Sequence, residues 1–150
     1  MTVKDDNVAI VWRMFEDGMG GNDLDAAVRD YAPGLIYHNP VLKEMPFLPG
    51  GTAGMKALMA ATRAAFPDMT CTVETIVANA DQVALMYSWT GTHVGALGPV
   101  APTGRTITAT GAIFCRLERG KIVEQWDIDD RLGVMQQMGL IPTPEAAGAV

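Results

Sequence analysis

The period of the hydrophobic residues changes halfway along this 150-residue chain, and that change limits the possible folds more than any other feature. In the first half, apolar residues recur every three or four positions, as on the buried face of an amphipathic helix. From about residue 70 onward they alternate with polar residues, as in strands that bury one face. Helices followed by strands indicate an α+β domain with helices packed on one face of a curved sheet.

The first half predicts three helices, because three segments end at glycine or proline. The first and third carry an apolar face, and Asn22-Asp23 can cap the second. The predicted helices lie at about 8–19, 22–31 and 52–66. The second half predicts four long antiparallel strands and a last helical turn or two. These elements lie at 70–79, 82–93, 105–117, 121–128 and 132–138.

The connecting segments complete a single domain over 1–150, with its core at about 8–140. A short extended run and a loop rich in proline and glycine separate the second and third helices, at 35–39 and 43–51. The segment 143–150 has no hydrophobic period, so we expect a flexible tail there.

Charge and hydropathy exclude several kinds of partner. The net charge is −6 and the basic residues are dispersed, which argues against binding nucleic acid or an anionic membrane. No apolar stretch reaches the roughly 18 residues of a membrane span, and the N-terminus lacks the pattern of a secretory signal. We therefore expect a soluble cytoplasmic protein.

The sequence carries no motif for a metal or a cofactor. Cys71 and Cys115 lie in separate strands, and two histidines are too few for a typical zinc site. Nucleotide-binding glycine loops and a nucleophile elbow are both missing from the sequence. We expect neither a metal nor a cofactor, and we interpret both cysteines as buried small hydrophobes.

The last strand places a carboxylate where acid/base chemistry is possible. Alternation puts Gln125, Asp127 and Asp129 on one face, and the preceding strand has an apolar face that includes Ile113. Burial beside apolar walls raises the pKa of a carboxyl toward neutral pH, as a general acid or base requires. The alternative is that these aspartates and Asp130 cap the final helix, although capping explains Asp127 least well.

Three further side chains are candidates for substrate contact. His38, at the end of a short strand, could bind a carbonyl or shuttle a proton, or it could simply fix a loop. Tyr87 and Trp89 alternate inward together, where they belong to the core or stack on a planar ligand. His93, at another strand end, is expected to make a structural hydrogen bond.

Several short motifs occur in an order that resembles the SnoaL-like polyketide cyclases over about residues 8–140. They are Tyr37-His38-Asn39-Pro40, Phe66-Pro67-Asp68, Gly91-Thr92-His93-Val94-Gly95, Pro102-Thr103-Gly104-Arg105, Gly120-Lys121-Ile122-Val123-Glu124 and Gln137-Met138-Gly139. The resemblance implies the nuclear-transport-factor-2-like fold, a cone-shaped curved antiparallel sheet with three helices packed on it. It also implies a homodimer or a higher homo-oligomer.

The resemblance also implies a reaction and its site. In the founding cyclases, an aspartate on the last strand is the acid/base of an intramolecular aldol closure that needs no metal or cofactor, and its position falls on Asp127. These cyclases place a histidine on the preceding strand, where this chain has Ile113. We expect an apolar, carbonyl-bearing, polyketide-like substrate that contacts His38, Tyr87, Trp89, Ile113 and Gln125. The alternatives are a cofactor-independent hydroxylase, an isomerase or dehydratase, and a protein that binds a ligand without catalysis.

Overall fold

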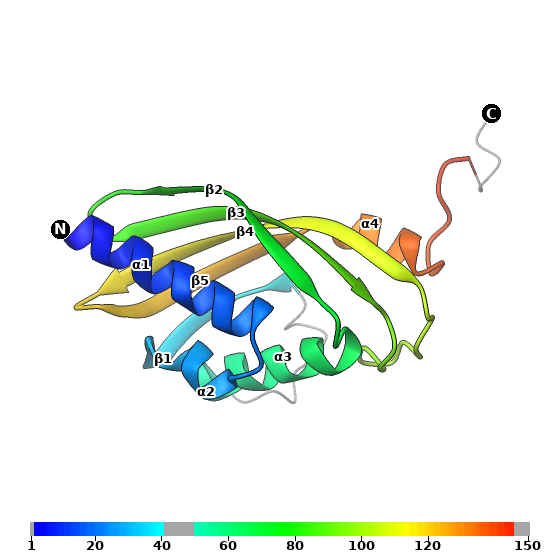
Figure 1. Cartoon of the computed structure of the whole chain (residues 1–150), viewed down its shortest axis with the longest axis horizontal. Helices are drawn as coiled ribbons and strands as arrows, with labels where there is room; N and C mark the ends of the chain where they lie inside the picture. Colours follow the sequence, from blue (N-terminus) through cyan, green and yellow to red (C-terminus); the bar gives the residue numbers. More distant parts are fainter. Residues whose placement is uncertain (1, 41–49, 146–150) are drawn as a thin grey trace.

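A five-stranded sheet curls around an interior that helices close. The structure, a computed structural model, describes residues 2–40 and 50–145 (Figure 1). In chain order the elements are α1 (Val3–Phe15), the π-helix η1 (Glu16–Gly20), α2 (Leu24–Val28), β1 (Tyr31–His38), α3 (Gly51–Ala65), β2 (Thr70–Ala78), β3 (Gln82–Thr92), β4 (Thr106–Glu118), β5 (Lys121–Asp129) and α4 (Arg131–Gln137). Most of the predicted loop 43–51, and residues 146–150 of the predicted tail, lie outside the described residues.

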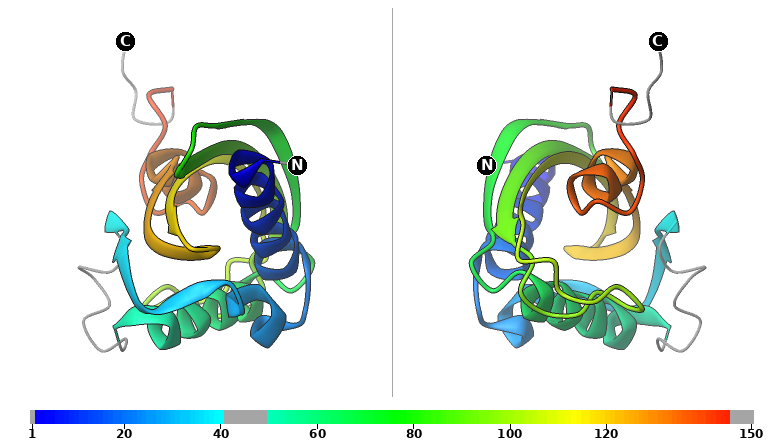
Figure 2. Two further views of the ribbon diagram at one scale, coloured as in Figure 1. Left: turned by 90° about the vertical axis from the view of Figure 1, so that its left-hand side faces the viewer. Right: turned by 90° about the vertical axis from the view of Figure 1, so that its right-hand side faces the viewer.

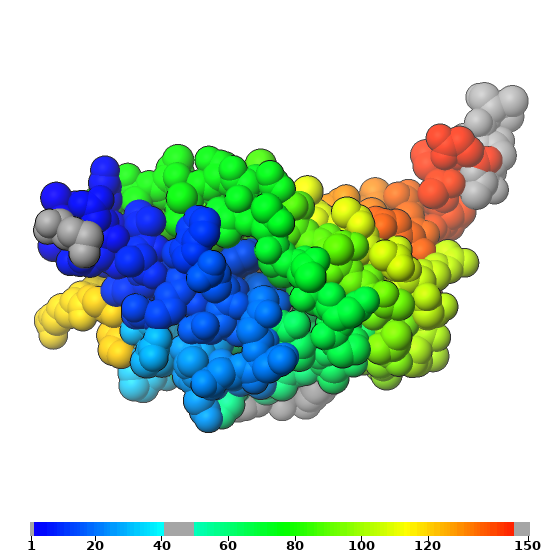
Figure 3. All heavy atoms as spheres, in the orientation of Figure 1, coloured from blue at the N-terminus to red at the C-terminus, as the bar shows by residue number. Residues whose placement is uncertain are grey.

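The strand order β1-β5-β4-β3-β2 gives a curved sheet that does not close into a barrel. In the end-on views of Figure 2, β2 to β5 form an arc, and α1 and α3 lie across its open side. α1 and α2 cover the interior on the face that Figure 3 shows. The predicted α+β class, the third helix and the four long strands are confirmed.

The first strand differs from the prediction. The second helix ends at Val28, not near Tyr31, and β1 then pairs with β5 in parallel, so the sheet is mixed and not wholly antiparallel. Tyr31 is buried and pairs with Ile122, which favours a strand at this point over a longer helix. Pro33 is tolerated within β1 because an edge strand has one side without ladder hydrogen bonds.

A bulge near the start of β5 changes which of its residues face inward. Leu117 pairs with Ile122 and Arg116 with Glu124, so Val123 has no partner of its own. One extra residue reverses the alternation, and Ile122 therefore faces the core although simple alternation predicts the opposite. Beyond the bulge, the alternation proceeds as predicted.

The core lies between the concave face of the sheet and the helices. Phe15 of α1 packs against Tyr87 of β3 with ring centroids 5.1 Å apart, and Met55 of α3 belongs to the same buried cluster. α1 ends earlier than predicted, because its last turn continues as η1, where Gly18 lies against the side chain of Met59. Met19, the next residue, is partly buried and packs against the core cluster.

The opposite face of the sheet remains partly apolar at the surface. Met86, Phe114 and Ile128 are exposed there, on neighbouring strands. The expected homodimer or higher homo-oligomer stays a prediction. In the described part of the chain, no helix combines the length and the apolar character needed to cross a membrane.

The predicted effect of a substitution at Gly95 tests the packing of the strand-end loop on α3. A Cβ atom at this position would lie 2.2 Å from the backbone oxygen of Ala64, so Gly95→Ala must displace backbone. We expect the free energy of unfolding in urea to fall by ~1–3 kcal/mol. Gly34→Ala is the control because a Cβ there meets no atom within 4 Å, and equal effects of both substitutions would contradict this packing.

Candidate active site

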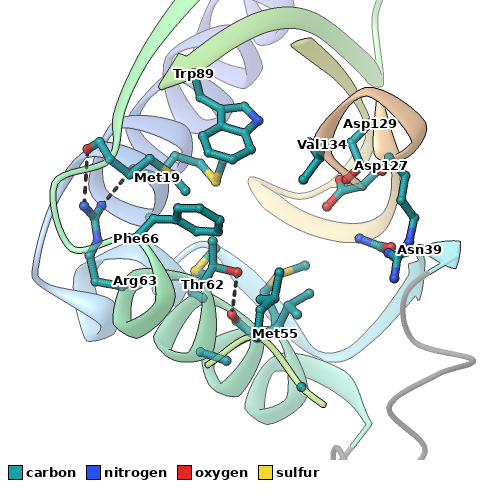
Figure 4. Close-up of a pocket in the computed structure, with 18 of the residues that line it drawn as sticks. Met19, Asn39, Met55, Thr62, Arg63, Phe66, Trp89, Asp127, Asp129 and Val134 are labelled. Atoms are coloured by element: carbon teal, nitrogen blue, oxygen red, sulfur yellow. Dashed lines mark hydrogen bonds between the residues drawn. The ribbon is translucent and has the colours of Figure 1, made fainter. Parts of the chain in front are cut away.

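A cavity of about 600 Å³ lies between the inner face of the sheet, α3, α4 and the loop at 97–100. Its walls are mainly apolar, and they include seven of the ten methionines of the chain. These are Met14, Met19, Met55, Met59, Met69, Met135 and Met138. Figure 4 shows Met19, Phe66 and Trp89 on one side of the cavity and Asp127 and Asn39 on the other.

Asp127 is the polar centre of the cavity, and β1 and β5 hold it in place. The Tyr37 hydroxyl donates a hydrogen bond to Oδ2 of Asp127, and Nε2 of Gln125 donates to Oδ1 at 2.8 Å. Asn39 Nδ2 donates in turn to the Tyr37 hydroxyl oxygen at 2.7 Å. The parallel register, in which Tyr37 lies beside Gln125, brings these groups together. Both carboxylate oxygens therefore have a donor.

Burial and hydrogen bonding act on the Asp127 carboxyl in opposite directions. Burial raises the pKa of Asp127 from 3.8 to about 6, and the negative charge of Asp129 adds to the rise. Hydrogen bonds from Tyr37, Gln125 and Asn39 lower the pKa, but burial is the larger effect. A carboxyl that titrates near neutral pH can both accept and return a proton.

The helix-capping role lies with a different aspartate. The Asp130 carboxylate accepts a hydrogen bond from the backbone nitrogen of Gly133 at 3.0 Å, as the N-cap of α4. Asp129 lines the cavity and is exposed. Asp127 points into the cavity and makes its hydrogen bonds with side chains of β1 and β5.

Four of the predicted contact residues lie around the cavity with Asp127. Ile113 of β4 pairs directly with Asp127 across the sheet and is 4% exposed. Tyr87 and Trp89 of β3 and Gln125 of β5 also line the cavity. The Trp89 ring meets Phe66 edge-on, with centroids 5.1 Å apart.

The expectation that His38 contacts the substrate is corrected. Its side chain lies on the outer face of the sheet, where the ring stacks on Trp126 with centroids 4.9 Å apart and Nε2 lies 2.8 Å from Glu124. The reason is alternation: in β1 and the residue after it, Tyr37 and Asn39 face inward and His38 faces outward.

His93 has the structural role that the sequence suggests. It is fully buried at the end of β3, and its Nδ1 accepts a hydrogen bond from the backbone nitrogen of Thr103 at 3.2 Å. Tyr37 and Asn39 line the cavity, and Tyr31 donates a hydrogen bond to Gln125; none of the three is among the site residues predicted from the sequence. The signal for Tyr37 and Asn39 is strand alternation, which places both on the face opposite to His38.

Both cysteines are protonated thiols. Burial raises the pKa of Cys71 to about 11 and that of Cys115 well above its ordinary range, so both remain thiols at neutral pH. Within residues 2–40 and 50–145, no cluster of three or more histidine, cysteine or acidic side chains could hold a metal ion.

Comparisons with known proteins identify the family. The sequence model described as SnoaL-like polyketide cyclase matches residues 9–138, so this chain belongs to the SnoaL-like polyketide cyclase family. A search of curated proteins finds no match.

Solved structures of relatives have the same fold. AclR from Streptomyces galilaeus, a proposed hydroxylase, is 26% identical with a TM-score of 0.80, and the match covers 97% of this chain and 92% of AclR. IdmH from Streptomyces antibioticus, a proposed polyketide cyclase, is 32% identical with a TM-score of 0.74, covering 89% of this chain and 98% of IdmH. A proposed SnoaL-like polyketide cyclase from Jannaschia sp. CCS1 is 25% identical with a TM-score of 0.80, covering 95% and 97%.

The buried carboxylate predicts a pH-dependent cost in stability. Because the pKa of Asp127 is about 6 in the folded protein and near 3.8 in the unfolded chain, the folded state loses stability as pH rises through 6. The loss is ~3 kcal/mol. Relative to wild type, Asp127→Asn should therefore gain about this amount in urea unfolding between pH 4 and pH 8.

The control for this measurement is Asp81→Asn, which removes an exposed carboxylate outside the cavity. If both substitutions change the pH dependence of unfolding equally, the gain reflects net charge alone and the Asp127 carboxylate is not desolvated.

Proposed function

We propose that this protein is an enzyme that transfers protons on an apolar, carbonyl-bearing, polyketide-like small molecule, with Asp127 as the general acid and base. The observation that carries the proposal is the position of the Asp127 carboxylate, which faces an apolar cavity and is held on both oxygens. The proposed chemistry is of the cyclase or aldol type and uses no cofactor.

The chemistry needs one proton acceptor and an enclosed apolar site. The Asp127 carboxylate takes the proton from the carbon beside a carbonyl group, and the C–H electrons form an enolate. The enolate carbon then attacks a second carbonyl of the same molecule, and Asp127 returns the proton to the resulting alkoxide. The raised pKa of Asp127 suits both steps. The carboxylate is basic enough to take the proton from carbon, and the carboxylic acid is acidic enough to return it to the alkoxide.

Ile113 cannot form a side-chain hydrogen bond, so the Asp127 carboxylate has other partners than the histidine that the resemblance implies. A histidine is expected at this position, directly opposite Asp127 in the sheet. In this chain the hydrogen bonds to the carboxylate come from Tyr37 and Gln125 instead. A phenol and an amide remain neutral at working pH, so of these three side chains Asp127 is the one that changes charge near neutral pH.

The cavity walls favour a flat, unsaturated substrate. A volume of about 600 Å³ is within the range of small-molecule sites. Methionine side chains adapt their shape and make favourable contacts with aromatic rings, and Trp89 offers a face for stacking. The relatives described as polyketide cyclases support a substrate of this kind.

A second candidate is a cofactor-independent hydroxylase, which the likeness to AclR favours. The two reactions differ in their use of oxygen. Hydroxylation of an aromatic polyketide consumes O₂, whereas aldol closure, isomerisation and dehydration leave O₂ unchanged. An oxygen electrode with wild-type protein and an aromatic polyketide therefore separates the hydroxylase from the other enzymes, and a ligand-binding protein without catalysis would leave the polyketide itself unchanged.

Proton exchange tests the role of Asp127 without the natural substrate. We expect wild-type protein in D₂O to exchange the α-hydrogens of an aromatic β-keto methyl ester, with a rate that rises as pH passes 6, because the ionised carboxylate is the base. Asp127→Asn should slow the exchange roughly 100- to 10,000-fold. Tyr37→Phe removes a hydrogen bond that lowers the pKa of Asp127, so the rise should move to higher pH.

His38→Gln is the matched control, because this side chain lies on the outer face of the sheet. We expect the rate of this variant to stay within about twofold of wild type, as for surface substitutions remote from a site. The assignment of Asp127 as the base is wrong if mass spectrometry detects wild-type deuterium incorporation with Asp127→Asn.

A further inference from the structure

A second layer of hydrogen bonds lies behind the Asp127 carboxylate. The hydroxyl of Tyr31, at the start of β1, donates to Oε1 of Gln125 at 2.6 Å, and Nε2 of Gln125 donates to Asp127 Oδ1 at 2.8 Å. Tyr31 and Gln125 are 4% and 1% exposed, so water cannot replace these partners. Tyr31 is not among the residues that line the cavity.

This layer gives the Gln125 amide one favoured direction. An amide has an acceptor end and a donor end, and only the donor end can face an ionised carboxylate favourably. Burial raises the pKa of Tyr31 well above its ordinary value, so its hydroxyl keeps its proton and can donate to the amide oxygen. The Cys115 thiol, 3.6 Å from the same oxygen, is a second and weaker donor.

The reversed amide would leave two groups without suitable partners. Its oxygen would face Asp127 Oδ1 with no proton between them when the carboxylate is ionised. Its NH₂ group would face the Tyr31 hydroxyl and the Cys115 thiol, whose protons would then lose the amide oxygen that accepts them in the observed arrangement. In a buried site each such mismatch costs ~1–3 kcal/mol.

We propose that Tyr31 is a positioning residue that fixes the direction of the Gln125 amide and so keeps an N–H donor on the Asp127 carboxylate. Its role in catalysis rests on the proposed function, but its effect on Asp127 exists in the protein without substrate. Tyr31 thereby adjusts the base strength of a residue that it does not touch.

Other charged or ionisable groups also face this site, and the Tyr31→Phe substitution leaves each of them in place. Tyr37 of β1, Tyr87 of β3 and Cys115 of β4 lie near Asp127, and Asp129 lies on the same strand. Arg63 of α3 and Arg131 of α4 line the same cavity.

The test is the titration of the Asp127 carboxyl carbon by NMR in substrate-free protein. With Tyr31→Phe the amide loses its strong donor and can turn, so the Asp127 midpoint should move to higher pH by roughly half to one unit. Tyr87→Phe is the matched control, because it removes another buried phenol without touching Gln125, and it should leave the side-chain NH₂ signals of Gln125 in their wild-type positions.

A second background shows whether Tyr31 acts through Gln125. In Gln125→Leu protein the Asp127 midpoint should already be raised, and adding Tyr31→Phe should change it no further. A wild-type midpoint in Tyr31→Phe, or an equal shift in both backgrounds, would overturn the proposal.

The amide signals keep the test decisive if Gln125→Leu does not fold. In Tyr31→Phe the Gln125 NH₂ protons should exchange with solvent faster than in wild type, and unchanged protection would refute the positioning role. Because no substrate is present, a failure here leaves the proposed proton transfer standing, and a failure of the exchange assay leaves this result standing.

Discussion

The arrangement of this protein depends on the burial of one carboxylate among methionine and aromatic side chains. Desolvation of Asp127 works against folding at neutral pH, and the donors Tyr37 and Gln125 offset part of that cost. A carboxylate with more donors would be a weaker base, and one with none would stay protonated. The hydrogen bonds present lower the pKa of Asp127 only in part, so this carboxyl changes charge near neutral pH.

The sheet topology makes this match possible. β1 pairs in parallel with β5, which places Tyr31 and Tyr37 on either side of the polar groups of β5. The bulge after Ile122 lets both Ile122 and Gln125 face inward, so that Ile122 is buried in the core and the Gln125 amide supports the Asp127 carboxylate. The cavity itself remains apolar because helices α3 and α4 line it largely with methionine, alanine, leucine and valine.

Alternation alone was enough to predict the inward face of Asp127 and Gln125, and the common side of Tyr87 and Trp89, because each lies in a long regular strand. It could not predict the partners of Asp127, since Tyr37 lies 90 positions away and meets it only through the parallel pairing of an edge strand. The error at His38 has a local cause. In the segment 37–40 the prediction rested on His38 because histidine is the most reactive side chain there. Strand alternation instead turns Tyr37 and Asn39 toward the cavity.

Membership of the SnoaL-like polyketide cyclase family accounts for the fold. The reaction depends on the side chains that this chain places in the cavity. What the chain's own residues supply is an Asp127 carboxyl that titrates in a desolvated site. Difference infrared spectroscopy of wild type against Asp127→Asn measures it directly, because a protonated carboxylic acid has a C=O band that the carboxylate lacks. We expect this band to disappear with a midpoint near pH 6. A midpoint at or below pH 4 would show that the carboxylate is solvated and that burial does not raise its pKa.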